Sequence, residues 1–342
     1  MQPKDLEARY AVALLAEFAS HQWEWMPDTL YMGGGTPSAI EPALFTQLLT
    51  ALPGRPWREA TLEAAPGSLT TEKTAAWVQA GINRVSLGVQ SFNKAELART
   101  GRRHDAETVQ RDVAMLRTAG ISNINLDLIS GLPGQSDASW KASVAAVLSL
   151  GVPHVSVYML EVDDDSRLGS EIMLGGKRYG ASDVPDDDAI AGFYEYAVDE
   201  LARHGIARYE ISNFARPGAE SPHNLKYWRR EPYIGFGSDA HSFDGTSRWQ
   251  NVESATDYVD RHGHSESVRA EISRPDAVEE KFFVGLRLAE GVEPDASDWQ
   301  RFGPAFERFL AGGVMEQFGT RLRLTARGIM ISNEIFQEFV SL

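Results

Sequence analysis

Polar residues close several short apolar stretches of this sequence, and a glycine-rich segment closes the first of them. The segment GGGTP (residues 33–37) presents backbone N–H and C=O groups that no side chain covers. Glu63, Gln90 and Asp127 each end a later apolar stretch, and Arg102 lies in the segment TGRRH between them. Carboxylates accept hydrogen bonds from ammonium and hydroxyl groups, and a guanidinium pairs with a carboxylate. These residues predict a site for a polar ligand that carries an amine, hydroxyl groups and a carboxylate.

Each of these signals also has a simpler interpretation. A glycine-rich turn after a strand is often only a tight connection, a lone polar residue there is commonly a loop anchor, and Arg102 alone reads as a surface arginine. GGGTP is not a P-loop, because no Lys-Ser/Thr pair follows it, and it lacks the spacing of a dinucleotide fingerprint. The predicted site therefore requires a fold that brings these residues close together.

A second group of residues suits a porphyrin. In HNLKYW (residues 223–228), His223 offers an imidazole nitrogen as an axial iron ligand, and Tyr227 and Trp228 offer flat aromatic surface. A His-Asn pair is more often a hydrogen-bonded loop element, so the residues alone leave both interpretations open. His241 is a second candidate ligand, although a structural histidine is its simpler interpretation.

The chain contains no cysteine. It therefore forms no disulfide and has neither a thiolate nucleophile nor a cysteine-ligated metal. Two runs of three aspartates, at residues 163–165 and 186–188, are typical of solvated segments on either side of a helix start. We favour that interpretation over metal binding.

Composition narrows the classes of function. The 342 residues are 43% hydrophobic and 24% charged, which favours a folded protein with a substantial core. A formal net charge of -15 disfavours non-specific binding to nucleic acid or to anionic lipid. No apolar run reaches transmembrane length and the N-terminus does not resemble a secretory signal, so we expect a cytoplasmic protein.

The elements that must position the polar set alternate between strand and helix. Strands are predicted at residues 29–32, 60–64, 84–89, 123–129 and 155–160. Helices are predicted at residues 6–18, 70–80, through Glu96, 108–119 and 139–150. This order predicts an α/β fold with a parallel sheet, either an (β/α) barrel or a doubly wound sheet, whose functional groups lie at the carboxyl ends of the strands. The chain begins with a helix, so the first βα unit lacks its strand.

A helix is predicted at residues 190–204, and the pattern changes after Arg248. Helices are then predicted at residues 277–289, 299–311 and 326–339, with a small strand pair around residues 321–324. Helices with a strand pair predict a compact domain of winged-helix type, and the acidic charge favours a structural or docking role over DNA binding. We expect three domains: a partial barrel at 1–165, a barrel extension with the HNLKYW motif at 166–270, and the winged-helix-like domain at 271–342.

Four segments carry a specific resemblance. YMGGGTPS (31–38), LEAAPG (62–67), SLGVQSF (86–92) and NLDLISGLPGQ (125–135) resemble, in order and spacing, successive signatures of the oxygen-independent coproporphyrinogen oxidase family of radical S-adenosylmethionine (SAM) proteins. HNLKYW is similar to the HNxxYW motif of the haem-chaperone branch of that family, and YEISNFA (209–215) and YIGFGSDAHSF (233–243) also resemble that branch. The similarity extends from residue 1 to residue 342.

The resemblance implies a partial (β/α) barrel of radical SAM type and assigns roles to the polar set. Gly34, Gly35 and Thr36 would meet the amino group of S-adenosylmethionine. The rest of that ligand would be bound by Glu63, Gln90, Arg102 and Asp127. These roles agree with the chemistry of the side chains.

The resemblance also implies haem binding by His223, Tyr227 and Trp228, with His223 on the haem iron. The function implied is a haem chaperone that passes haem to an acceptor protein, which the sequence does not identify. The first alternative is an oxygen-independent coproporphyrinogen III oxidase, which decarboxylates propionates by radical chemistry in porphyrin biosynthesis. The second alternative is a relict without cluster or catalysis.

One departure from the family bears on mechanism. Family members carry a CxxxCxxC motif after the first strand, whose thiolates hold a [4Fe–4S] cluster, and this chain has no cysteine anywhere. As written, the chain is predicted to be inactive in radical chemistry, so S-adenosylmethionine and the cluster belong to a complete protein. Because the first strand and the motif are missing together, we expect the chain to be an N-terminally truncated form of a longer protein.

Sequencing the DNA in frame upstream of the Met1 codon tests this expectation. We expect it to encode a short apolar strand followed by CxxxCxxC, because the missing motif would lie just before Met1. An in-frame stop codon ahead of any such segment would contradict the expectation.

Overall fold

The computed structural model describes residues 4–160, 178–262, 269–274 and 276–340, which form two compact units. The sheet unit consists of Tyr31–Ile40 and Glu59–Glu220, and the terminal unit consists of Met1–Leu30, Glu41–Arg58 and Ser221–Leu342. The aspartates at 163–165 lie outside the described residues, whereas those at 186–188 are exposed at the start of a helix. No helix in the described ranges is both long and apolar enough to span a membrane.

A seven-stranded sheet has the order β1-β2-β3-β4-β5-β7-β6. Its strands are β1 (Thr29–Met32), β2 (Glu59–Ala64), β3 (Arg84–Gln90), β4 (Asn123–Ser130), β5 (His154–Met159), β6 (Ala207–Arg208) and β7 (Asn213–Ala215). Strands β2 to β5 pair in parallel, and β7 runs antiparallel to β5 and β6. The predicted α/β class and its five strands are confirmed. Strands β6 and β7 were missed, because two or three residues are too few to show an alternating pattern.

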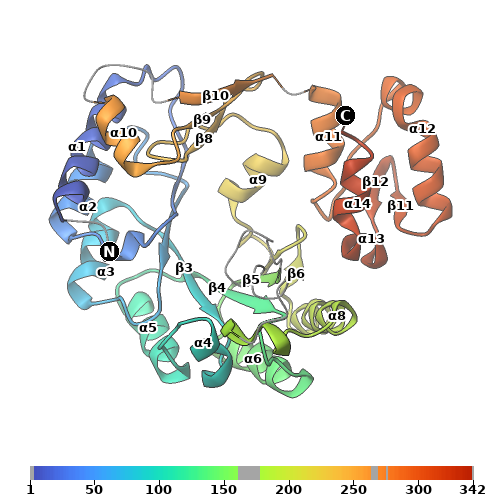
Figure 1. Cartoon of the computed structure of the whole chain (residues 1–342), viewed down its shortest axis with the longest axis horizontal. Helices are drawn as coiled ribbons and strands as arrows, with labels where there is room; N and C mark the ends of the chain where they lie inside the picture. Colours follow the sequence, from blue (N-terminus) through green and yellow to red (C-terminus); the bar gives the residue numbers. More distant parts are fainter. Residues whose placement is uncertain (1–3, 161–177, 263–268, 275, 341–342) are drawn as a thin grey trace. The chain divides into compact units, whose positions relative to one another are not determined.

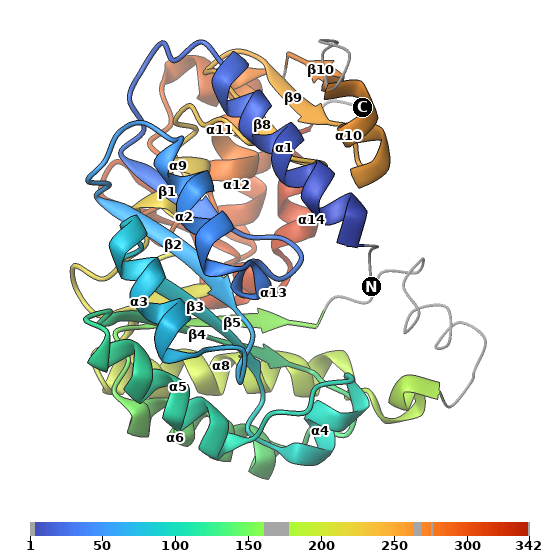
Figure 2. The same cartoon turned by 90° about the vertical axis from the view of Figure 1, so that its left-hand side faces the viewer.

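The two faces of this sheet differ in chemistry. Val85, Leu87 and Val89 of β3 are fully buried, and they alternate with Arg84, Ser86, Gly88 and Gln90. Strands β4 and β5 repeat this alternation. Four helices lie along one side of the sheet, as Figure 1 and Figure 2 show, namely α3 (Thr71–Ala80), α5 (Ala106–Thr118), α6 (Asp137–Leu150) and α8 (Asp187–Arg203). The apolar face packs against helices, and the opposite face is polar.

Side-chain caps fix where these helices begin. The residue before each helix accepts a hydrogen bond from a backbone N–H of the first turn; these residues are Thr70, Asp105, Ser136 and Asp186. Such a cap contributes about 1 kcal/mol. Helices α3 and α6 end at Gly81 and Gly151, both with a left-handed backbone. The connections from strand ends to helix starts are thereby defined. Gly34, Gly35, Thr36 and Arg102 lie on such connections, whereas Glu63, Gln90 and Asp127 lie within β2, β3 and β4. A short helix, α4 (Lys94–Arg99), follows β3.

The terminal unit contains mostly helices and a small sheet. Helix α1 (Lys4–Ser20) packs on α10 (Ala255–His262), and the rings of Tyr10 and Tyr258 lie 5.0 Å apart. The other elements of this part are α2 (Pro42–Thr50), α9 (Pro222–Trp228), and the antiparallel strands β8 (His241–Phe243), β9 (Arg248–Asn251) and β10 (Arg269–Ser273). The predicted helix at 6–18 is confirmed as α1.

The C-terminal segment of the terminal unit has a core of phenylalanines. It comprises α11 (Ala277–Gly285), α12 (Ala296–Ala311), the hairpin of β11 (Met315–Phe318) and β12 (Arg321–Leu324), α13 (Ala326–Met330) and α14 (Ser332–Gln337). The ring of Phe282 lies 5.7, 5.0 and 5.3 Å from those of Phe302, Phe306 and Phe339. Helices surround this strand pair, and its assignment to the winged-helix type stays a prediction.

The single helix predicted at residues 326–339 is wrong. The chain leaves the helical conformation at Ile331 and forms two short helices, α13 and α14. Ile329 and Ile335 are both buried. Six residues apart on one helix, they would point about 120° apart at 100° per residue. The break lets both side chains reach the core.

Replacing Phe282 by alanine tests how much this aromatic core contributes. We expect a loss of roughly 3–5 kcal/mol in the free energy of unfolding, because the substitution leaves a cavity among packed rings. Phe318→Ala is the control, since Phe318 is 59% exposed, and it should change the free energy by less than about 1 kcal/mol. Urea unfolding followed by circular dichroism measures both. Similar losses in the two variants would contradict the assignment of this core.

Candidate ligand-binding sites

Two glycines after β1 adopt a backbone that other residues avoid. Gly34 and Gly35 have φ angles of +76° and +62°, and a Cβ at either would meet no atom within 4 Å. At Gly33 a Cβ would lie 2.7 Å from the ring of Tyr31 and 3.0 Å from Glu63 Oε1. The loop therefore approaches Glu63 closely on one side and leaves its backbone open on the other. Thr36, which precedes the short helix η1 (Pro37–Ala39), uses its side chain for no cap.

Glu63 is fixed by two donors. The hydroxyl of Tyr31 donates to Oε1 at 2.6 Å, and the backbone N–H of Gly34 donates to Oε2 at 3.3 Å. Burial, and next the charge of Glu63, raise the pKa of Tyr31 far above its ordinary value, so the phenol keeps its proton and donates. The carboxylate is held against the glycine loop.

Asp127 lies on the polar face of β4. Asn125 Nδ2 donates to its Oδ1 at 2.7 Å, and Ser86 Oγ donates to its Oδ2 at 3.1 Å. Burial raises the pKa of Asp127, and the charge of Glu63 raises it further, while hydrogen bonds from Ser156, Ser86 and Asn125 act in the opposite direction. Asp127 on β4 and Glu63 on β2 therefore interact through their charges across β3.

Gln90 and Arg102 meet at Gly88. Arg102 Nη1 donates to the carbonyl oxygen of Gly88 at 2.9 Å, and a Cβ at Gly88 would lie 3.2 Å from Gln90 Nε2. Gln90 has a φ of +67°, a conformation that costs a non-glycine residue energy. Its Oε1 is buried and has no hydrogen-bond partner among the described residues. Burial lowers the pKa of Arg102, and the charge of Asp127 opposes this.

The fold thus gathers the predicted polar set of the sheet unit. Gly34 contacts Glu63, Glu63 and Asp127 interact through their charges, and Arg102 interacts with Asp127. The arrangement offers carboxylate acceptors, a guanidinium donor, open loop backbone and the unpaired Oε1 of Gln90. An unpaired buried acceptor of this kind fits a ligand that brings a hydrogen-bond donor.

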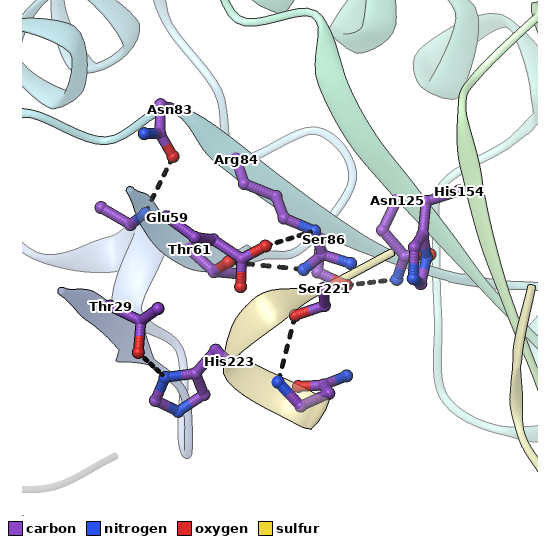
Figure 3. Close-up of polar contacts among 12 residues, drawn as sticks. Thr29, Glu59, Thr61, Asn83, Arg84, Ser86, Asn125, His154, Ser221 and His223 are labelled. Carbon is purple, nitrogen blue, oxygen red and sulfur yellow. Dashed lines mark hydrogen bonds and ion pairs between the residues drawn. The ribbon is translucent and has the colours of Figure 1, made fainter. Parts of the chain in front are cut away.

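In the terminal unit, His223 lies on helix α9 and is buried. Thr29 Oγ1 lies 2.9 Å from its Nδ1, a contact drawn in Figure 3, and Tyr227 Oη lies 2.8 Å from its Nε2. His223 and Tyr227 are four residues apart, so they share one face of the helix. Both imidazole nitrogens have hydrogen-bond partners within the protein. Iron that binds to Nε2 of His223 must displace the Tyr227 hydroxyl.

The other predicted haem residues differ in their surroundings. Trp228 follows Tyr227 on α9, and its buried indole N–H has no hydrogen-bond partner in the described part of the chain. The guanidinium of Arg287 lies 5.2 Å from the centre of a Trp228 ring. His241 begins β8 and is exposed. The structure therefore brings His223 and Tyr227 into contact, and within the described ranges the N–H of Trp228 has no partner.

Sequence analysis missed the residues behind the strand ends. Tyr31, Ser86, Asn125 and Ser156 all contribute hydrogen bonds around Glu63 and Asp127. Asn125 lies two residues before Asp127, Ser86 pairs with Glu63 of β2, and Ser156 pairs with Asp127 of β4. The signal that could have found them is polar residues at every second position of β3, β4 and β5.

Known proteins resemble this chain over most of its length. Residues 3–147 match the Radical SAM superfamily, and residues 272–331 match the HemN C-terminal domain. Heme chaperone HemW of Lactococcus lactis is 34% identical over 97% of this chain and 89% of its own length. Heme chaperone HemW of Bacillus subtilis is 33% identical over 92% of this chain and 86% of its own length.

A solved structure shares the fold. Coproporphyrinogen III oxidase (HemN) from Escherichia coli superposes with a TM-score of 0.82 at 20% identity, over 99% of this chain and 85% of that chain. The glycine loop after β1, the mostly parallel sheet and these matches define a radical SAM fold. The chain belongs to the radical SAM superfamily, in the family of the heme chaperone HemW proteins.

The iron–sulfur cluster that this superfamily implies does not fit the residues present. The 342 residues include no cysteine, so they offer no thiolate to iron. Among the described residues, no three His, Asp or Glu side chains are grouped as a metal site either. No chemical step through a cluster can be assigned to the residues of this chain.

Proposed function

We propose that this chain is a haem-binding protein of the chaperone type, which passes haem to an acceptor protein and binds S-adenosylmethionine in its sheet unit. The name of its relatives, heme chaperone, over most of the chain length supports the first part. The observation that carries it here is the His223–Tyr227 pair on α9, beside a Trp228 N–H that has no hydrogen-bond partner among the described residues.

His223 is the candidate iron ligand. Its Nε2 is bonded to a tyrosine hydroxyl, a weak neutral partner that a metal can replace, whereas its Nδ1 is oriented by Thr29. Burial raises the pKa of Tyr227, which disfavours the phenolate that tyrosine would need as a ligand. The N–H of Trp228 suits an acceptor such as a haem carboxylate.

The sheet unit offers a partner for each polar part of S-adenosylmethionine. Glu63 and the open backbone of Gly34, Gly35 and Thr36 suit its ammonium group, and Arg102 suits its carboxylate. Asp127 suits hydroxyl groups, and Gln90 Oε1 has an unused acceptor site for a donor of the ligand. In radical SAM proteins the cluster cleaves this ligand; these residues only bind and orient it.

The oxidative decarboxylation of coproporphyrinogen is not assigned to this chain. The likeness to the Escherichia coli oxidase is one of fold, at 20% identity. The radical that this reaction needs is generated at a thiolate-bound cluster, and the chain has no cysteine. Haem binding needs no such cluster.

A haem titration of His223→Ala tests the first proposal. We expect the wild-type chain to give a Soret band, and the variant to bind haem at least roughly tenfold more weakly, because one coordinate bond is lost. Tyr227→Phe should bind haem at least as well as wild type, since it removes the hydroxyl that competes for Nε2.

His241→Ala is the matched control, because His241 is exposed on β8 and should leave the Soret band unchanged. Loss of the band in Tyr227→Phe would make tyrosine the ligand. A band that survives unchanged in His223→Ala would remove His223 from the site.

Gly35→Ala tests the S-adenosylmethionine site. Alanine at a left-handed position costs roughly 1–2 kcal/mol and shifts the loop that faces the ligand, so we expect at least about tenfold weaker binding by calorimetry. Gly120→Ala is the control, because Gly120 also has a positive φ, +97°, and a Cβ there would meet no atom within 4 Å. Gly120 precedes β4, so it lies at the amino end of that strand, away from the predicted ligand site. Equal losses of affinity in both variants would argue against a ligand at the loop.

A further inference from the structure

A chain of hydrogen bonds extends from Asp127 into the interior of the sheet unit. Asn125 Nδ2 donates to Asp127 Oδ1 at 2.7 Å, and Asn125 Oδ1 lies 2.6 Å from His154 Nδ1. His154 Nε2 lies 2.9 Å from the hydroxyl of Tyr209. Figure 3 draws Asn125 and His154 side by side, with Ser86 next to Asn125. Asn125 and His154 are almost completely buried.

The donor and acceptor types of these groups place the protons along the hydrogen-bond chain. Burial, and next the positive charge of Arg84, lower the pKa of His154 well below its ordinary value, so the ring is neutral and carries one N–H. The Asn125 amide must direct its NH2 group to the Asp127 carboxylate, since its oxygen would be repelled there. His154 then donates from Nδ1 to Asn125 Oδ1, and the Tyr209 hydroxyl donates to Nε2.

All three bonds therefore point in one direction, from Tyr209 through His154 and Asn125 to the carboxylate. Donors aligned in this way polarise one another and strengthen the last bond. Ser86 and Ser156 accept from the same amide, at 2.7 and 2.9 Å. The Asn125 amide connects His154 to Asp127. A rotation of this amide by half a turn would exchange the oxygen that faces His154 with the NH2 group that faces Asp127.

We infer that Asn125, His154 and Tyr209 are positioning residues of the ligand site, which hold the Asp127 carboxylate ionised and oriented as an acceptor for ligand hydroxyls. The inference rests on the proposed S-adenosylmethionine site and adds residues that do not touch the ligand. His154 acts through the amide: without its N–H, Asn125 is free to turn its oxygen toward Asp127 and favour the protonated acid.

Other charged or titratable groups also act on Asp127. Glu63 on β2 and Arg102 after α4 have opposite effects on its charge. Tyr31 on β1 and Tyr158 on β5 interact with it as well. None of these groups contacts Asn125 by a hydrogen bond in the described residues, so a change at His154 leaves them in place.

The titration of Asp127 tests the inference without any ligand. The carbon-13 signal of its carboxyl group, assigned by its absence in Asp127→Asn, gives the pH midpoint of ionisation. We expect a higher midpoint in Asn125→Ala and in His154→Leu, because the ionised form loses its donor. His154→Gln should return the midpoint toward the wild-type value, since a glutamine amide can still donate to Asn125 Oδ1. Tyr209→Phe, which removes only a hydroxyl, should give a smaller rise.

Calorimetry with S-adenosylmethionine then tests the consequence for binding. At neutral pH, His154→Leu should bind roughly tenfold more weakly, with recovery in His154→Gln. Thr61→Val is the matched control, because Thr61 is fully buried on β2 and its hydroxyl pairs with Arg84, not with Asn125. It should change neither the midpoint nor the affinity.

The outcomes separate this inference from the proposed function. An unchanged midpoint in Asn125→Ala, or identical behaviour of His154→Gln and His154→Leu, would overturn the positioning role. If these variants shift the midpoint while the wild-type chain binds no S-adenosylmethionine, the result supports the hydrogen-bond chain and refutes the ligand.

Discussion

Each strand from β2 to β5 must place apolar side chains on one face and polar side chains on the other. The apolar face packs against helices, and the polar face is also buried: Ser86, Asn125, His154 and Ser156 are at most 5% exposed. A buried polar group without a partner costs about 1–3 kcal/mol, so these side chains must bond to one another. Asp127 is hydrogen-bonded to that internal network through Asn125 and Ser86, and the orientation of its carboxyl group depends on it.

The strand-end residues could be predicted because the geometry of parallel strands is general. Glu63, Gln90 and Asp127 lie in the carboxyl-terminal halves of parallel strands, the part where such sheets carry their functional groups. The partners of these residues could not be predicted in the same way. The contact between Asn125 and His154 depends on the register in which β4 pairs with β5, and a slip of one residue would turn every side chain to the opposite face. Local sequence does not specify that register.

Contacts between segments far apart in the sequence also determine features that the local sequence pattern does not predict. Ser221 and Pro222 are typical of a helix start, yet nothing in HNLKYW predicts that Thr29, 194 residues earlier, bonds to His223. The same limit explains the last helix. The periodicity of residues 326–339 favours one helix, whereas the chain breaks at Ile331 and buries both Ile329 and Ile335. In both cases tertiary packing overrides the local signal.

The absence of cysteine changes what the sheet unit must supply to a ligand. In radical SAM proteins the cluster iron anchors the amine and carboxylate of S-adenosylmethionine. Here those groups would be held only by hydrogen bonds and charge, each worth about 1.5–3 kcal/mol when an ion is involved. Affinity then depends on how far Glu63, Asp127 and Arg102 are oriented before the ligand arrives. The donors behind the two carboxylates, Tyr31 for Glu63 and Asn125 with His154 for Asp127, provide that orientation from within the fold.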